Sequence, residues 1–259
     1  MSSELRWPFL GVTVAIAITS AMDAVGLESF SAFPLALLLG TFWHLQRLSR
    51  REVGFTMGDS RSYLLAIAYP SAVMALLATA AAAFRAIDLS HTDWRKTGLN
   101  FLLVAVATTL VASVTEEGFF RGWLWASLER AGLRGPMILL WTSVAFALWH
   151  WSAAILAAGF KPPPSQVPVY LLNALVIGAV FGLLRWRSGS VFVSSVCHGV
   201  WNGLAYVFFG FGKKVGALGI QDTGVFGPEV GFLGLALNVF VLLLWLWYDR
   251  RVRPEWAVS

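Results

Sequence analysis

The sequence predicts an all-α protein, a polytopic membrane helix bundle with about eight transmembrane helices. The chain of 259 residues is 58% apolar and has a mean hydropathy of +0.70. Charged residues make up 13% of it, about half of the share in a typical soluble domain. The apolar residues also form long runs, most of which approach the ~20 residues that a membrane-spanning helix needs.

Eight runs are candidate spans, and the first two are the shortest. They cover residues 8–22, 29–45, 63–84, 99–117, 136–158, 167–185, 190–209 and 230–248. Arg6 before the first run and Thr19-Ser20-Ala21 at its end are features of a cleavable signal peptide. We expect an uncleaved helix, which is more usual in a polytopic protein. The whole chain, residues 1–259, reads as a single integral-membrane domain whose core motifs lie within 99–209.

The lysines and arginines predict the orientation in the membrane. With eight spans, thirteen of them lie on the side that holds both termini and six on the other. The first group is Arg6, Arg47, Arg50, Arg51, Arg61, Arg121, Arg130, Arg134, Arg185, Arg187, Arg250, Arg251 and Arg253. The second is Arg85, Arg95, Lys96, Lys161, Lys213 and Lys214. The positive-inside rule then places both termini in the cytoplasm. Because membrane topology explains the net charge of +5, we expect a lipid bilayer and no nucleic acid as partner.

Three connections have distinctive compositions. Residues 46–62 are polar and are expected to contain a short interfacial segment. Three prolines predict a stiff, extended stretch at 160–164. Residues 210–228 are rich in glycine and are expected to be flexible. The single cysteine, Cys197, excludes an internal disulfide and is expected to be a buried packing residue.

Glu116, Glu117 and Arg121 follow an uncharged run, Leu99–Val114. A charged side chain at the bilayer centre costs roughly 2.5–3.5 kcal/mol, so this cluster predicts a functional site in or at the edge of the membrane. Adjacent residues on a helix point about 100° apart, so the two glutamates should not enter one small cavity in the same way. We expect Glu117 to form an ordinary ion pair with Arg121 at the membrane interface. Glu116 is then free for chemistry, or it is a carboxylate that snorkels to the helix end.

His150, His198 and Asn202 are polar residues within later spans. His198 and Asn202 are four residues apart, so they share a helix face and can donate two hydrogen bonds to one point, as an oxyanion hole does. The alternative is an interhelical hydrogen-bonding pair that only stabilises the bundle. His150, with Phe146 one turn earlier, is by itself more typical of a packing residue. It also lies about fourteen residues into its span, against about eight for His198, so the two meet only if the helices are tilted or offset.

The set is more informative than its members. One glutamate, two histidines and an asparagine on three spans can converge on one cavity, where a glutamate beside a histidine can hold a water and remove its proton. His44 and His91 lie near span ends without polar partners at helical spacing and are not expected in this site.

The three motifs, Glu116-Glu117-x-x-x-Arg121, Phe146-x-x-x-His150 and His198-x-x-x-Asn202, occur in an order that resembles a known family. This is the CPBP family (CAAX prenyl protease and bacteriocin-processing, also called Abi) of intramembrane endopeptidases. The resemblance extends from Glu116 to Asn202, and the flanking spans agree with the eight-helix fold of the family.

The resemblance implies a role for each residue. Glu116 and His150 would activate water, His198 and Asn202 would stabilise the oxyanion, and Glu117 and Arg121 would be supporting residues. It further implies cleavage of a membrane-associated protein or peptide near its C-terminus or leader, reached from the cytoplasmic side or the membrane. Eukaryotic members trim prenylated CAAX proteins, and bacterial members are linked to peptide maturation, immunity or sorting signals. The short chain suggests a bacterial member in the inner (cytoplasmic) membrane.

Other functions fit parts of the pattern. Two histidines and a glutamate form a known zinc ligand set, so a metal-dependent protease is an alternative, although a His-x-x-x-His pair is absent and Asn202 is a poor ligand. We therefore expect no metal or other cofactor. A non-catalytic immunity or scaffold protein could use the same cavity for binding. A proton-relaying transporter would show paired half-spans with internal symmetry, and the sequence shows none.

Overall fold

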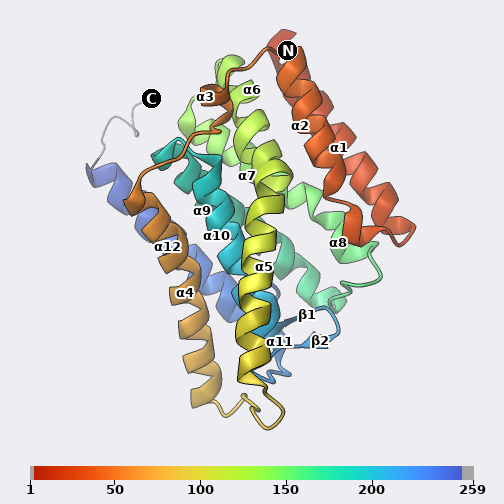
Figure 1. Ribbon diagram of the computed structural model, residues 1–259, viewed down its shortest axis with the longest axis vertical. Coiled ribbons are helices and arrows are strands. Elements are labelled where there is room, and N and C mark those ends of the chain that lie inside the picture. The colour runs from red at the N-terminus through yellow and green to blue at the C-terminus, as the bar shows by residue number, and fades with distance from the viewer. Residues whose placement is uncertain (1–2, 253–259) are drawn as a thin grey trace.

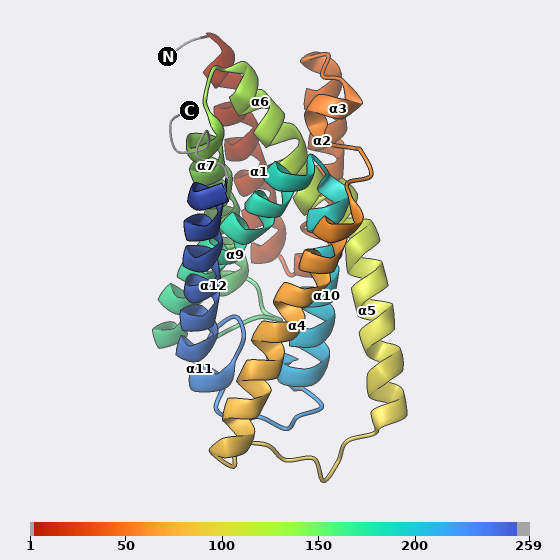
Figure 2. The same cartoon turned by 90° about the vertical axis from the view of Figure 1, so that its left-hand side faces the viewer.

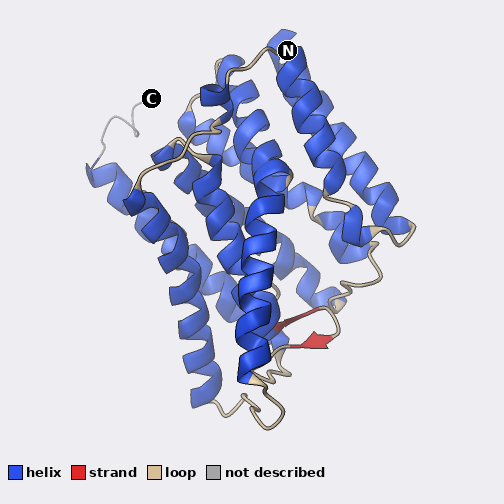
Figure 3. Cartoon of the chain, viewed as in Figure 1, coloured by secondary structure: helices blue, strands red, loops and turns tan. Residues whose placement is uncertain are grey.

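The computed structural model describes residues 3–252, and most of them are helical (Figure 3). The first half of the chain forms η1 (Ser3–Leu5), α1 (Arg6–Ala24), η2 (Glu28–Phe30), α2 (Phe33–Leu45), α3 (Arg50–Val53), α4 (Ser60–Ala83) and α5 (Trp94–Val114). The second half forms η3 (Gly118–Leu124), α6 (Trp125–Arg130), α7 (Gly135–Trp149), α8 (Trp151–Ile155), η4 (Pro164–Gln166), α9 (Val167–Ser188), α10 (Val191–Leu204), η5 (Ala205–Phe209), β1 (Gly210–Phe211), β2 (Lys214–Val215), α11 (Thr223–Phe226) and α12 (Phe232–Val252). Within residues 3–252, seven helical stretches are long and apolar enough to cross a membrane. The prediction of a polytopic helix bundle is therefore confirmed.

The expected span at 29–45 is the one that the structure corrects. Part of it forms the 3₁₀ turn η2, and α2 begins only at Phe33, with a proline in its first turn. The 13 residues of α2 extend about 20 Å at 1.5 Å per residue, which is short of the ~30 Å hydrocarbon core. α2 nevertheless returns the chain to the end of the bundle where α1 begins (Figure 1). The number of candidate spans is thus seven, while the direction of the later helices is the expected one.

Two further expected spans are interrupted at polar residues. α5 ends at Val114, because Thr115 has the non-helical angles φ −109° and ψ −102°, and η3 then continues as a π-helix. α7 ends at Trp149, and His150 separates it from the short α8. Irregular backbone at membrane depth is tolerated where it is buried in protein or lines a cavity. π-Helical turns are likewise frequent at functional sites.

α10 lies at the centre of the bundle and makes its most extensive contacts with α5. The close approach depends on Gly199, because a Cβ there would collide with the carbonyl of Ala105 and the side chain of Thr109. α4 and α9 also pack on α10, and α7 packs on α9. The interrupted ends of α5 and α7 are thereby brought beside the middle of α10.

Different helix ends and connections lie at the two ends of the bundle. The start of α1, α3, the α6–α7 connection and the C-terminal end of α12 lie at one end (Figure 2). We call this the terminal end. The α4–α5 connection, α11 and the β1–β2 hairpin lie toward the other, which we call the hairpin end. Residues 210–228, expected to be a flexible loop, include this antiparallel hairpin, in which Gly210 pairs with Val215 and Phe211 with Lys214. Arg253 lies outside the described residues.

Candidate active site

Glu116 lies between the two histidines. Its Oε2 is 3.8 Å from Nε2 of His150 and 3.9 Å from Nε2 of His198. These distances exceed a direct hydrogen bond, as is common for catalytic groups in the absence of substrate. The side chains of Glu116 and His150 are each 17% exposed, so both remain accessible from the bundle interior. The structure therefore brings together the glutamate and both histidines that the sequence singled out.

His150 owes its orientation to the end of α7. Its Nδ1 lies 2.9 Å from the carbonyl oxygen of Phe146, which only accepts, so Nδ1 carries the proton and Nε2 faces Glu116. The ring of Phe146 lies 4.3 Å away between centroids, and that of Trp149 lies 4.8 Å away. The expected packing of Phe146 beside His150 is thus confirmed. The aromatic contacts hold the imidazole in place rather than occupying the side that faces Glu116.

Glu117 holds His198 from the other side. Its Oε1 is 3.1 Å from Nδ1 of His198 and 3.3 Å from Nη1 of Arg121. Arg121 also donates from Nη2 to the carbonyl of Gly178 at 2.9 Å, and its guanidinium lies 4.1 Å from the centroid of the Phe146 ring. The side chains of Glu117 and Arg121 are both 0% exposed. The expected ion pair of Glu117 with Arg121 is therefore confirmed, but it is not an ordinary pair, since it is fully buried and also bonded to His198.

Both glutamates reach the same imidazole, one at each ring nitrogen. A regular helix would point Glu116 and Glu117 about 100° apart, and the sequence predicted that they would not enter one small cavity in the same way. Thr115 breaks the helix just before them and η3 has a wider turn just after them, so α-helical phase does not apply here. The two carboxylates approach opposite sides of the ring, with Glu116 the more accessible acid and Glu117 the partner of Arg121.

Asn202 lies one turn after His198 on α10 and lines the same cavity. Among the residues that the structure describes, none forms a hydrogen bond with its side-chain amide. The cavity has a volume of about 40 Å³, more than the roughly 10–15 Å³ that one water needs. It is lined by Phe146, His150, Tyr170, Asn173, Ala174, Ile177, Phe181, His198, Trp201, Asn202, Tyr206 and Glu229. We call it the catalytic cavity below.

His150 and His198 lie at different positions along their helices, yet their rings meet at Glu116. They lie at the end of the 15-residue α7 and eight residues into α10, yet both approach one oxygen of Glu116. Counted along the axes, the rings would differ in depth by about 10 Å at 1.5 Å per residue. The two helices must therefore be inclined or start at different heights.

Residues 98–204 match the family described as type II CAAX prenyl endopeptidase Rce1-like. The chain carries an Rce1-like family domain. All six predicted site residues lie within the matched segment, which runs from the start of α5 to the end of α10. The family consists in general of proteolytic enzymes. No curated protein matches the chain.

The residues of the Rce1-like domain do not form a recognisable metal site. Across the described part of the chain, no group of three or more His, Cys, Asp or Glu side chains has the arrangement to hold a metal ion. Nδ1 of His198 is bonded to Glu117 and Nδ1 of His150 to a carbonyl, which leaves Nε2 of each ring facing Glu116. Such Nδ1 contacts also occur in histidines that bind zinc. No step of the proposed reaction is assigned to a metal.

Sequence reasoning missed one acid and two amides at this site. Glu229 lines the catalytic cavity from the loop before α12, outside the Rce1-like match. Asn173 and Asn238 are buried in α9 and α12, where an amide within an apolar run was the available signal. Glu229 carried no such signal, because it lies in a glycine-rich connection whose place over the cavity depends on the tertiary fold.

Proposed function

We propose that this protein is an intramembrane endopeptidase that hydrolyses a peptide bond of a membrane-associated protein or peptide. The observation that carries this proposal is the approach of Nε2 of both His150 and His198 to Oε2 of Glu116, beside a cavity that Asn202 also lines. Nε2 of a neutral histidine and a carboxylate are both hydrogen-bond acceptors. A water that donates one hydrogen to Glu116 and one to His150 satisfies both groups.

The proposed reaction uses Glu116 as the general base. It takes a proton from this water, and the resulting hydroxide attacks the carbonyl carbon of the scissile bond. Asn202 donates to the oxyanion from its amide, and His198 donates from Nε2 in its doubly protonated form. When the C–N bond breaks, the proton held by Glu116 passes to the leaving nitrogen. The products are a carboxylic acid and an amine, and the enzyme is regenerated.

Glu117 and Arg121 act as positioning residues in this scheme. The carboxylate of Glu117 accepts from Nδ1 of His198, which fixes the ring and stabilises the imidazolium that the oxyanion needs. Arg121 keeps Glu117 ionised through their buried ion pair and is itself anchored on the carbonyl of Gly178. The side chains of both residues are fully buried, whereas that of Glu116 is 17% exposed, so neither is assigned a direct contact with substrate.

The test is cleavage by the full chain reconstituted in liposomes with a panel of membrane-anchored peptides, read by mass spectrometry. Glu116→Gln should reduce kcat/KM by at least about a hundredfold, the scale of a lost general base. Asn202→Ala should cost about 10²–10³ through its oxyanion contact. Equal cleavage by the wild type, Glu116→Gln and His150→Ala would contradict the proposal. Binding of a cognate peptide without cleavage would instead favour the immunity or scaffold function.

We also propose that the protein lies in a bacterial cytoplasmic membrane with its terminal end in the cytoplasm. The support is the excess of lysine and arginine in the connections of that end, including Arg50 and Arg51 of α3.

A further inference from the structure

Glu229 lies where two hollows of the protein meet. It lines the catalytic cavity, and it also lines a larger hollow of about 210 Å³ at the hairpin end of the bundle. We call this second hollow the vestibule; Phe160, Lys161, Phe211, Lys213 and Lys214 are among its lining residues. Glu229 is the residue that both linings share, so a chain that passes from the vestibule into the catalytic cavity passes its carboxylate.

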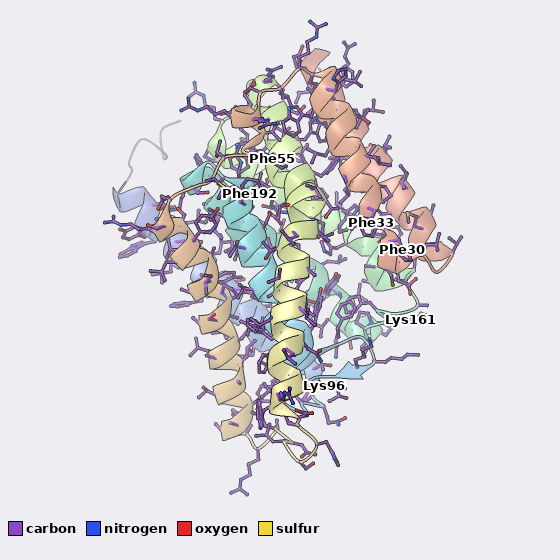
Figure 4. All side chains as sticks on the ribbon, in the orientation of Figure 1. Phe30, Phe33, Phe55, Lys96, Lys161 and Phe192 are labelled. Carbon is purple, nitrogen blue, oxygen red and sulfur yellow. The ribbon has the colours of Figure 1, made fainter. Side chains whose placement is uncertain are left out.

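The vestibule is built from two connections distant in sequence. Phe160 stacks on Phe211 of β1, with ring centroids 4.8 Å apart and an interplanar angle of 6°. Gly212 lies so close to the carbonyl of Gly159 that a Cβ there would collide with it, and its φ of +58° suits glycine. These contacts hold Lys161 beside the hairpin, as Figure 4 shows. The rim of the vestibule is therefore basic, and the acid lies further in.

The side chain of Glu229 is held by a neutral donor. Nε1 of Trp201 donates to its Oε1 at 3.3 Å, and Tyr206 lines the same catalytic cavity. Within residues 3–252, no lysine or arginine forms an ion pair with Glu229. Burial raises the pKa of its carboxyl to about 7, since the loss of water outweighs this hydrogen bond. The cation that acts on Glu229 is His198, whose imidazole is already paired with Glu117.

The backbone of Glu229 is fixed by a chain of buried amides. Nδ2 of Asn173 donates to the carbonyls of Pro228 at 2.7 Å and Glu229 at 3.1 Å. Asn238 donates to Oδ1 of Asn173 at 2.8 Å and accepts from the hydroxyl of Tyr69 at 2.6 Å. We call Tyr69, Asn173 and Asn238 the amide clamp. It ties α4, α9 and α12 to one short loop, so Glu229 cannot swing away from the catalytic cavity without breaking buried hydrogen bonds, each of which is costly to lose.

From this placement we propose that Glu229 is a specificity residue that binds a positively charged group of the substrate next to the scissile bond. A carboxylate without a lysine or arginine partner, in a neck of low dielectric constant, attracts an ammonium or guanidinium strongly. The basic rim opposes a guest with many positive charges, so a single cation is favoured over a polybasic segment. The proposal rests on the proteolytic function above, because the guest is the substrate.

The test compares paired membrane-anchored peptides that differ only in one residue beside the cleaved bond, lysine in one and norleucine in the other. For the wild type in liposomes, kcat/KM should favour lysine by about tenfold, which corresponds to about 1.4 kcal/mol. Glu229→Gln keeps a hydrogen-bonding side chain of the same shape and should remove the preference. Glu229→Lys should favour a glutamate peptide instead. A merely structural role would lower all rates together and leave the ratios unchanged.

Two controls separate the possible outcomes. Asp222→Asn alters another acid of the same connection, which caps α11 and lines neither hollow, and it should keep the lysine preference. Peptide binding is also measured in a Glu116→Gln background, with and without Glu229→Gln. One outcome is that the wild type cleaves no peptide, while lysine-selective binding still depends on Glu229. The proteolytic function then fails and the assignment of Glu229 survives. A lysine preference that Glu229→Gln leaves intact, or no preference in the wild type, overturns the assignment.

Discussion

Glu117 holds His198 through a hydrogen bond: its Oε1 lies 3.1 Å from the Nδ1 of that imidazole, and its side chain is fully buried. Glu116, the next residue, lies 3.9 Å from the opposite nitrogen and is partly accessible. Two adjacent acids thus have separate tasks, because one has Arg121 as its counter-charge and the other lies near Nε2 of both His150 and His198. This division leads to the first prediction.

Glu117→Gln and Glu116→Gln should differ in their effect on stability. Removing the charge of Glu117 leaves Arg121 buried without a counter-charge, which should lower the free energy of unfolding by about 3–5 kcal/mol. It should also reduce proteolysis by about a hundredfold, because His198 loses support for its charged form. Glu116→Gln should reduce activity by at least about a hundredfold with little change in stability. Unfolding by SDS in mixed micelles measures the difference, and equal stability losses would contradict the division of tasks.

Gly178→Ala should loosen the anchor of Arg121. A Cβ at position 178 would lie 3.2 Å from Nη2 of Arg121 and equally close to the ring of Phe146, so one of them must move. We expect a loss of about 1–3 kcal/mol in the free energy of unfolding, as in other overpacked cores, together with reduced activity. Gly98→Ala in α5 is the matched control, because its Cβ would have no neighbour within 4 Å. If Gly98→Ala is destabilised as much as Gly178→Ala, the loss of stability does not come from crowding around Arg121.

Glu229 should make stability depend on pH. Its pKa rises from 4.5 to about 7 on folding because of burial, so between these values the folded state binds the proton and the unfolded state does not. Stability from this group is therefore lost as the pH rises through about 7. Glu229→Gln cannot lose a proton. The difference between its melting temperature in detergent and that of the wild type should therefore shift in favour of the variant from pH 5 to pH 8.

Asp59→Asn provides the comparison for this titration. Hydrogen bonds from Ser62 hold the pKa of Asp59 below its usual value, so this carboxyl is ionised at both pH 5 and pH 8. The difference between its melting temperature and that of the wild type should be the same at the two pH values. If Glu229→Gln behaves like Asp59→Asn, then Glu229 does not titrate near pH 7.

The orientation of the bundle can be read from cysteine labelling in intact cells. Lys214→Cys places a thiol on the hairpin, and Arg51→Cys places one on α3 at the terminal end; both sites are exposed. With the terminal end in the cytoplasm, a membrane-impermeant maleimide should label the first variant and not the second. Cys197 is buried and should remain silent. Labelling of Arg51→Cys alone would reverse the orientation and place the vestibule on the cytoplasmic side.

Much of the bundle could be predicted from the order of residues. Apolar runs long enough to cross a bilayer mark helices such as α4, α9 and α12, because the lipid leaves the backbone few alternatives to a helix. The run at 29–45 misled because length was judged from hydropathy, while the turn at η2 and the following proline shortened the helix. Glu116, His150, His198 and Asn202 were recognisable because each is a polar residue in an apolar run.

Tertiary structure alone decided how those residues meet. The break at Thr115, the burial of Arg121 against the carbonyl of Gly178, and the place of Glu229 over the cavity each depend on contacts between segments far apart in sequence. Local sequence determines which side chains prefer water or lipid, since that preference belongs to each residue. Which of them share a cavity is determined by the packing of α5, α7, α9 and α10, because packing sets distances that no helical periodicity contains.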